Sequence, residues 1–192
     1  MMTREEALKY VQSRTKNVNL VKHMLAVEAE MRALAKHFSA KGGQEQDEKL
    51  WGLAGLVHDA DYEQMKEKHP SEEFFKQLEE LKFDPKIIQA VKAHGWKFQP
   101  GLAEPQTKME WSLYCCDELS GLIIACALVR PEKKLAAVTV ESVLKKWKEK
   151  SFAAGVHREQ IALCEEKLGI SLPEFIELSL KAMQAISGDL GL

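Results

Sequence analysis

The chain has 192 residues, 45% of them hydrophobic, and a formal net charge of −2, a balance typical of one well-buried soluble domain. Such a charge predicts no attraction to a nucleic acid polymer or to an anionic membrane. The N-terminus, MMTREEALKY, lacks the apolar core of a signal peptide, and the longest apolar run, near Leu119 to Val129, is too short to span a bilayer. We therefore expect a cytoplasmic protein.

The first half of the chain predicts helices with clear start signals. Thr3-Arg-Glu-Glu6 is a capping box that opens a short helix. A long amphipathic helix follows, with a stop signal at Ser39–Gly43, and its apolar positions step by four and three: Leu20, Met24, Val27, Met31, Leu34 and Phe38. Three further helices are expected to begin near Asp47, at Pro70-Ser71-Glu72-Glu73 and at Asp84-Pro85.

The second half continues the helical pattern after a loop from Trp96 to Lys108. The predicted helices there are Met109–Val129, Val140–Lys150, His157–Leu168 and Pro173–Ile186. Leu135–Val140 is slightly strand-like but short, and no other segment resembles a strand. We therefore predict an all-α fold, a single helical domain over residues 1–192.

The four cysteines lie in helix-like sequence and form no C-x-x-C motif. We interpret them as reduced, small hydrophobic residues in a cytosolic protein: Cys115, Cys116, Cys126 and Cys164.

One short stretch places polar residues where apolar ones are expected. Gly52-Leu-Ala-Gly-Leu-Val reads as buried helix, and His58 and Asp59 follow it directly. A buried charge without a partner is costly, so this pair needs something to bind.

Four more polar residues occupy similar positions: His23, His69, His94 and Asp117. His23 flanks the long apolar stripe, His94 ends the face that carries Ile87 and Val91, and Asp117 lies in the least polar helix. Imidazoles and carboxylates together are good ligands for a divalent transition metal.

Each of these residues also has an ordinary structural explanation. A core-facing histidine is more often a hydrogen-bonded core residue than a ligand, Asp117 can cap a helix or pair with an arginine, and His69 can be solvent-exposed at a helix start. We assign no function to His37 or His157.

The pattern taken together resembles the H…HD…D signature of the HD superfamily of metal-dependent phosphohydrolases. It covers about residues 19–121, with the additional C-terminal helices at about 140–187 outside it. The residues that carry it are His23, His58-Asp59-Ala-Asp-Tyr, His69-Pro70, Ala-Val-Lys-Ala-His94 and Cys-Asp117-Glu-Leu-Ser-Gly121. The pattern looks like that of small bacterial HD-domain proteins described as predicted hydrolases.

The resemblance implies that one metal is bound by His23, His58, Asp59 and Asp117. In two-metal members, two further histidines lie between the dyad and the last Asp, and the dyad's Asp bridges the metals. His69 and His94 fall in that interval, so they would bind a second metal or contact substrate phosphate. Several members place a lysine three residues after the dyad's Asp; Tyr62 stands there in this chain, so phosphate contacts of that lysine cannot be transferred.

A bound metal lowers the pKa of its water and neutralises charge on phosphoryl oxygens. One or two divalent ions are implied, and the ligand types do not distinguish Mn, Fe, Mg, Ni, Co and Zn. Asp59 and Asp61 are the catalytic candidates. Asp61 is a proton acceptor for the nucleophilic water or, as an equal alternative, a hydrogen-bond partner of His58. Lys97, Lys150 and Arg158 are weak candidates for binding phosphate.

We therefore expect a phosphohydrolase that cleaves a small phosphate ester, such as a nucleotide or another phosphorylated metabolite, with metal-activated water. Two alternatives stay open: a di-iron oxygenase on the same scaffold, and a non-catalytic metal-containing sensor that binds a nucleotide. The sequence does not decide the oligomeric state.

Overall fold

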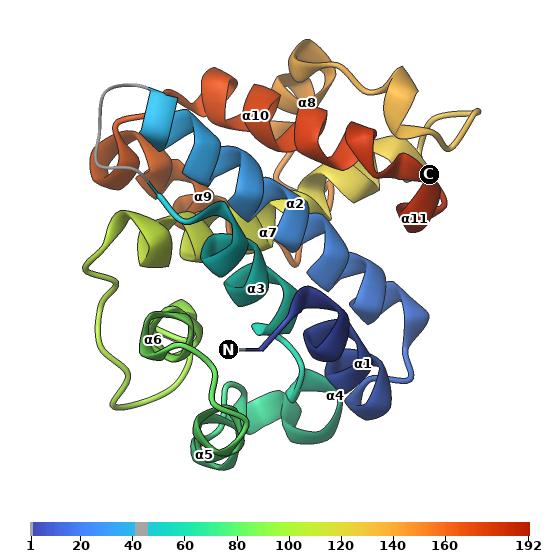
Figure 1. The fold of residues 1–192 in the computed structure, drawn as a ribbon. Coiled ribbons are helices and arrows are strands. Elements are labelled where there is room, and N and C mark those ends of the chain that lie inside the picture. The colour runs from blue at the N-terminus through green and yellow to red at the C-terminus, as the bar shows by residue number, and fades with distance from the viewer. Residues whose placement is uncertain (1, 41–45) are drawn as a thin grey trace.

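A computed structural model describes residues 2–40 and 46–192, and every regular element in these ranges is a helix or a helical turn (Figure 1). The predicted all-α fold is confirmed, since the described residues contain no strand. The strand-like run at Leu135–Val140 contains a 3-10 turn, η2 (Leu135–Ala137), and its last residue begins helix α8 (Val140–Trp147).

The bounds of the helices are α1 (Arg4–Arg14), α2 (Val18–Ala40), α3 (Glu48–Val57), α4 (Tyr62–Met65), α5 (Glu72–Glu80), α6 (Pro85–His94), α7 (Lys108–Leu128), α8 (Val140–Trp147), α9 (Arg158–Leu163), α10 (Leu172–Ala185) and α11 (Ser187–Leu190). Connections in the first half of the chain are mostly short, and a longer one, residues 95–107, joins α6 to α7.

The predicted start signals act as caps. The Thr3–Glu6 capping box opens α1, and the Asp47 carboxylate accepts the backbone N–H groups of Lys49 and Leu50 at the start of α3. Ser71 caps α5, and Asp84 caps α6 with Pro85 in its first turn. Each cap satisfies backbone donors that the first turn leaves unpaired. The stop signal at Ser39–Gly43 lies mostly outside the described residues.

The chain departs from its periodic pattern in the C-terminal third. The predicted helix over His157–Leu168 divides into α9 and a π-helical turn, η3 (Cys164–Leu168), which ends at left-handed Gly169. Helix α8 ends three residues earlier than predicted, where the Arg158 guanidinium donates to the carbonyl of Trp147.

The helices α4 and α11, four residues each, were not predicted, because so short a segment shows no period.

Helix α2 crosses the molecule, with α3 and α10 packed along it and α7 beside it (Figure 1). Helix α7 is long and apolar enough to cross a membrane by length and composition, yet 67% of its most apolar window is buried inside the protein. The buried core helix of a soluble protein meets the same criterion of length and composition. All four cysteines are buried and free, as predicted.

Candidate metal centre

Six residues from five parts of the chain meet at one end of the α2, α3 and α7 packing. His23 comes from α2, and His58 and Asp59 come from the end of α3. One connection and two helices supply the others: His69 follows the turn η1 (Lys66–Lys68), His94 is the last residue of α6, and Asp117 comes from the middle of α7.

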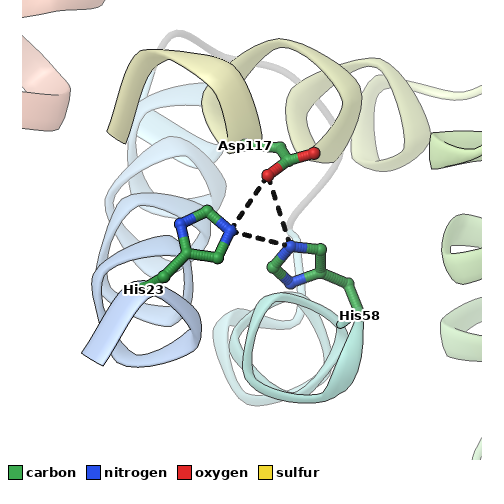
Figure 2. Close-up of side chains that lie close together, drawn as sticks. All are labelled: His23, His58 and Asp117. Carbon is green, nitrogen blue, oxygen red and sulfur yellow. Dashed lines mark hydrogen bonds and ion pairs between the residues drawn. The ribbon is translucent and has the colours of Figure 1, made fainter. Parts of the chain in front are cut away.

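His23, His58 and Asp117 form the first triad (Figure 2). Asp117 Oδ1 lies 3.0 Å from His23 Nε2 and 3.4 Å from His58 Nε2, and the two nitrogens are 3.3 Å apart. Ligand atoms that share one ion at about 2.1 Å lie roughly 3 to 3.5 Å from one another. The triad therefore has the spacing of a metal-ligand set.

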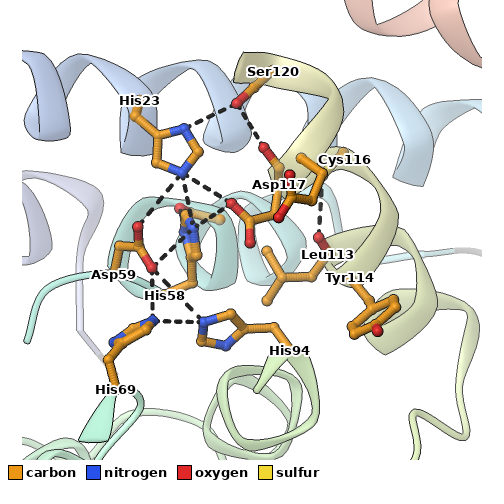
Figure 3. Close-up of polar contacts among 12 residues, drawn as sticks. His23, His58, Asp59, His69, His94, Leu113, Tyr114, Cys116, Asp117 and Ser120 are labelled. Carbon is orange, nitrogen blue, oxygen red and sulfur yellow. Dashed lines mark hydrogen bonds and ion pairs between the residues drawn. The ribbon is translucent and has the colours of Figure 1, made fainter. Parts of the chain in front are cut away.

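Asp59, His69 and His94 form the second triad (Figure 3). His69 Nε2 lies 2.8 Å from Asp59 Oδ1 and 2.9 Å from His94 Nε2, while His94 Nε2 is 3.8 Å from Asp59 Oδ1. The Asp59 carboxylate also reaches the first triad, 3.5 Å from His58 Nε2 and 3.6 Å from His23 Nε2. Asp59 therefore belongs to the second triad and also borders the first.

Backbone carbonyls fix the orientation of two of the imidazoles. His58 Nδ1 lies 2.8 Å from the carbonyl oxygen of Gly55, and His94 Nδ1 contacts the carbonyl oxygen of Val91. Because a carbonyl oxygen can only accept, each Nδ1 carries a hydrogen. In its neutral form, each ring therefore directs a lone pair on Nε2 into the site.

The other two imidazoles are oriented by side chains. His69 Nδ1 lies 2.6 Å from Asp61 Oδ1, and the second oxygen of Asp61 accepts the backbone N–H of Ser71 at 2.9 Å. His23 Nδ1 lies 2.9 Å from Ser120 Oγ. The Ser120 hydroxyl donates to the carbonyl of Asp117 at 2.8 Å, so it accepts from His23. Partners of this kind orient metal-ligating histidines and set their tautomer.

The carboxylates give the cluster a strong preference for positive charge. Burial opposes ionisation of Asp59, yet His58 and His69 outweigh it and hold the Asp59 pKa well below its ordinary value. Burial also opposes protonation of His58 and His69, but the surrounding carboxylates outweigh this effect. The pKa of His58 is raised to about 9 and the pKa of His69 to about 10. Burial and the neighbouring imidazoles lower the pKa of His94. Without a metal ion, protons on His58 and His69 supply the positive charge that balances the carboxylates.

Asp61 is fully buried behind the second triad. The structure pairs Asp61 with His69 and not with His58. The Nδ1 of His58 donates to the carbonyl oxygen of Gly55 instead. This position corresponds to a supporting carboxylate rather than to a group that faces the cavity.

The three weak candidates for phosphate binding do not join the site. Lys97 lies over the Trp96 ring at 4.2 Å, and Lys150 is exposed. The Arg158 guanidinium donates to the carbonyls of the turn before it, at 3.0 Å to Trp147 and 2.6 Å to Phe152. None of them is among the described residues that line the cavity above the triads.

A cavity of about 570 Å³ opens over both triads. Besides the ligand candidates, its walls hold Tyr62, Lys66, Phe98, Glu118 and His157. The sequence predicted no role for Lys66, Phe98, Glu118 or His157. The position of Glu118 directly after Asp117 in the apolar helix α7 is the one sequence feature that could have indicated a role.

No protein-family model, curated protein or solved structure matches this chain. The candidate site is therefore assigned from the chemistry and spacing of its own residues.

Proposed function

We propose that the protein is a metal-dependent phosphohydrolase of the HD type that hydrolyses a small phosphate ester. The observation that carries the proposal is the convergence of four imidazole Nε2 atoms and two carboxylates beneath one open cavity (Figure 3). The Nδ1 atom of each of the four imidazoles has a hydrogen-bond acceptor in the protein.

The donor set fits divalent ions. If all four imidazoles are neutral with Nδ1–H, their Nε2 lone pairs face one another at 2.9 and 3.3 Å, so a cation, either protons or a metal ion, has to lie between them. A cation relieves that repulsion, and imidazole with carboxylate suits manganese, iron, nickel, cobalt, zinc or magnesium to different degrees. His23, His58 and Asp117 would hold one ion, His69 and His94 a second, with Asp59 shared between them.

When bound, such ions supply a water of lowered pKa and neutralise charge on the phosphoryl oxygens. The chain's own residues do the rest. Asp61 and Ser120 keep His69 and His23 in their ligand orientations. Lys66 lines the cavity as a cation for the phosphoryl group.

The cavity walls favour a substrate that carries a flat ring. Tyr62 and Phe98 line it and remain 43% and 47% exposed, so part of each side chain is accessible to a ring of the substrate. This supports a nucleotide as the phosphate ester, the substrate class expected from the sequence.

Metal analysis followed by a phosphate-release screen tests the proposal. The purified protein, loaded with manganese under nitrogen, should release inorganic phosphate from at least one nucleotide or sugar phosphate. Iron-dependent oxygen consumption without phosphate release would favour the oxygenase alternative. Nucleotide binding without turnover would favour the sensor.

A further inference from the structure

A histidine–glutamate pair lines the same cavity without belonging to either triad. His157 Nδ1 lies 2.8 Å from Glu118 Oε1, and the backbone N–H of His157 donates to Glu118 Oε2 at 2.9 Å. Glu118 follows the ligand candidate Asp117 on α7, so the pair is anchored next to the metal centre.

The surroundings of His157 hold the ring in one place. Both oxygens of Glu118 bind the same residue, and the Phe98 ring packs against the imidazole with centroids 5.1 Å apart. The preceding turn is tied down by Arg158, whose guanidinium donates to the carbonyls of Glu149 and Phe152 at 3.2 and 2.6 Å. This is where Arg158 contributes to the site: it shapes the segment that carries His157.

The chemistry of His157 differs from that of the triad histidines. Its Nδ1 donates to a carboxylate, and its Nε2 makes no hydrogen bond with any described residue. The hydrogen bond to Glu118 raises the pKa of His157, and the negative charges of Glu118, Glu159 and Asp117 act in the same direction. When metal is bound, the four triad imidazoles use their Nε2 lone pairs as ligands and so have no proton to give, whereas the protonated form of His157 carries a hydrogen on its Nε2. Among the described residues that line the cavity, His157 is the histidine free to donate one.

We propose that His157 is the general acid of the reaction and that Glu118 is the residue that positions it. The assignment rests on the proposed phosphohydrolase function. Water attacks phosphorus, the bond from phosphorus to the leaving oxygen breaks, and that oxygen takes the proton from His157 Nε2. The attacking water loses a proton to solvent and the neutral imidazole regains one, so the balance is one ester and one water converted to one alcohol and one phosphate.

The test compares two leaving groups in His157→Gln and Glu118→Gln. An alkoxide, as from adenosine 5′-monophosphate, needs a proton, whereas the nitrophenolate of p-nitrophenyl phosphate leaves without one. Loss of a general acid typically costs about 10²–10⁴-fold. We expect that loss for His157→Gln on adenosine 5′-monophosphate, with less than about a tenfold change on p-nitrophenyl phosphate. Glu118→Gln should show the same selectivity with a smaller loss.

Two controls separate this role from a structural one. His37→Gln removes a histidine that lies 3.9 Å from a glutamate, Glu174, away from the cavity, and should leave both rates unchanged. Metal content and melting temperature of His157→Gln should equal those of the wild type. An equal loss on both substrates, or loss of metal, would overturn the general-acid assignment while leaving the phosphohydrolase proposal in place. A wild type inactive on every phosphomonoester would overturn both.

Discussion

At the scale of single residues, Asp59 has the greatest influence on the site. It contacts imidazoles of both triads: its Oδ1 approaches His69 and His58, and its Oδ2 approaches His23. It is 8% exposed, so its charge cannot be balanced by bulk water and must be balanced by cations in the site. A shared carboxylate of this kind couples the occupancy of one triad to that of the other.

Asp59→Ala should lose at least one bound ion and nearly all activity, because the substitution removes the carboxylate proposed to be shared by the two ions. Elemental analysis of the purified variant is the measurement. Glu72→Gln, which changes an exposed carboxylate on α5, is the matched control and should keep the wild-type metal content. A fully metallated Asp59→Ala protein would contradict the role of Asp59.

Asp61→Asn should weaken metal binding at the second triad alone. The amide retains the shape of the carboxylate but loses the charge that holds His69 in its tautomer. Changes in such supporting partners typically cost about 10–100-fold in affinity. A manganese titration should therefore show one binding event near wild-type affinity and one weakened event. Two unchanged events would leave Asp61 with only a structural role.

At the scale of secondary structure, the site depends on how closely α2 and α3 approach each other. Gly55 lies at their contact: a Cβ added there would come within 2.7 Å of the Val27 carbonyl oxygen on α2. The same residue offers its own carbonyl to His58. The glycine thus sets the helix spacing and the orientation of one ligand, and the spacing brings His58 towards His23.

Gly55→Ala should destabilise the protein and weaken the first triad together. Overpacking costs roughly 1–3 kcal/mol, and because the added Cβ would meet backbone atoms we expect the upper part of that range, more than the roughly 1 kcal/mol that alanine gains over glycine inside a helix. Chemical denaturation and metal titration measure the two effects. The control is Gly188→Ala, where an added Cβ meets no atom within 4 Å. Equal stability of the two variants would show that the close approach is not limiting.

At the scale of the whole molecule, the metal-free protein holds protons where an ion would bind. Folding raises the pKa of His58 and His69 from 6.5 to about 9 and about 10. A raised pKa gives stability that is fully present below pH 6.5 and is lost as the pH rises through 9 and 10. A metal competes with these protons, so its binding strengthens as the pH rises.

The melting temperature of metal-loaded protein should therefore exceed that of chelated protein by a margin that widens from pH 6.5 to pH 8.5. An ion at 1,000 times its Kd adds about 4 kcal/mol, and in a chain of this size roughly 2–4 °C accompany each kcal/mol. Thermal melts with and without chelator at each pH provide the measurement. A margin that stays constant or narrows with pH would contradict a site whose histidines exchange protons for metal.

The sequence by itself predicted the longer helices and singled out the six ligand candidates. Caps such as Thr3, Asp47 and Asp84 act within a few residues of themselves, and the apolar period of α2 follows from helix geometry alone. His58, Asp59 and Asp117 were recognisable because each interrupts an apolar helix, and such an interruption is a local property. The four-residue helices α4 and α11 were not predicted, because they are too short to show a helical period.

The tertiary structure alone decided how these residues are grouped and supported. Whether Asp61 supports His58 or His69 depends on where the chain turns after α3, and no local period encodes that choice. The pairing of His157 with Glu118 joins residues 39 apart in the chain, and Arg158 proved to hold a turn rather than face the cavity. The physical reason is the same in each case. A residue's type and neighbours in sequence determine whether it can be buried, but its partner is set by which helices pack together.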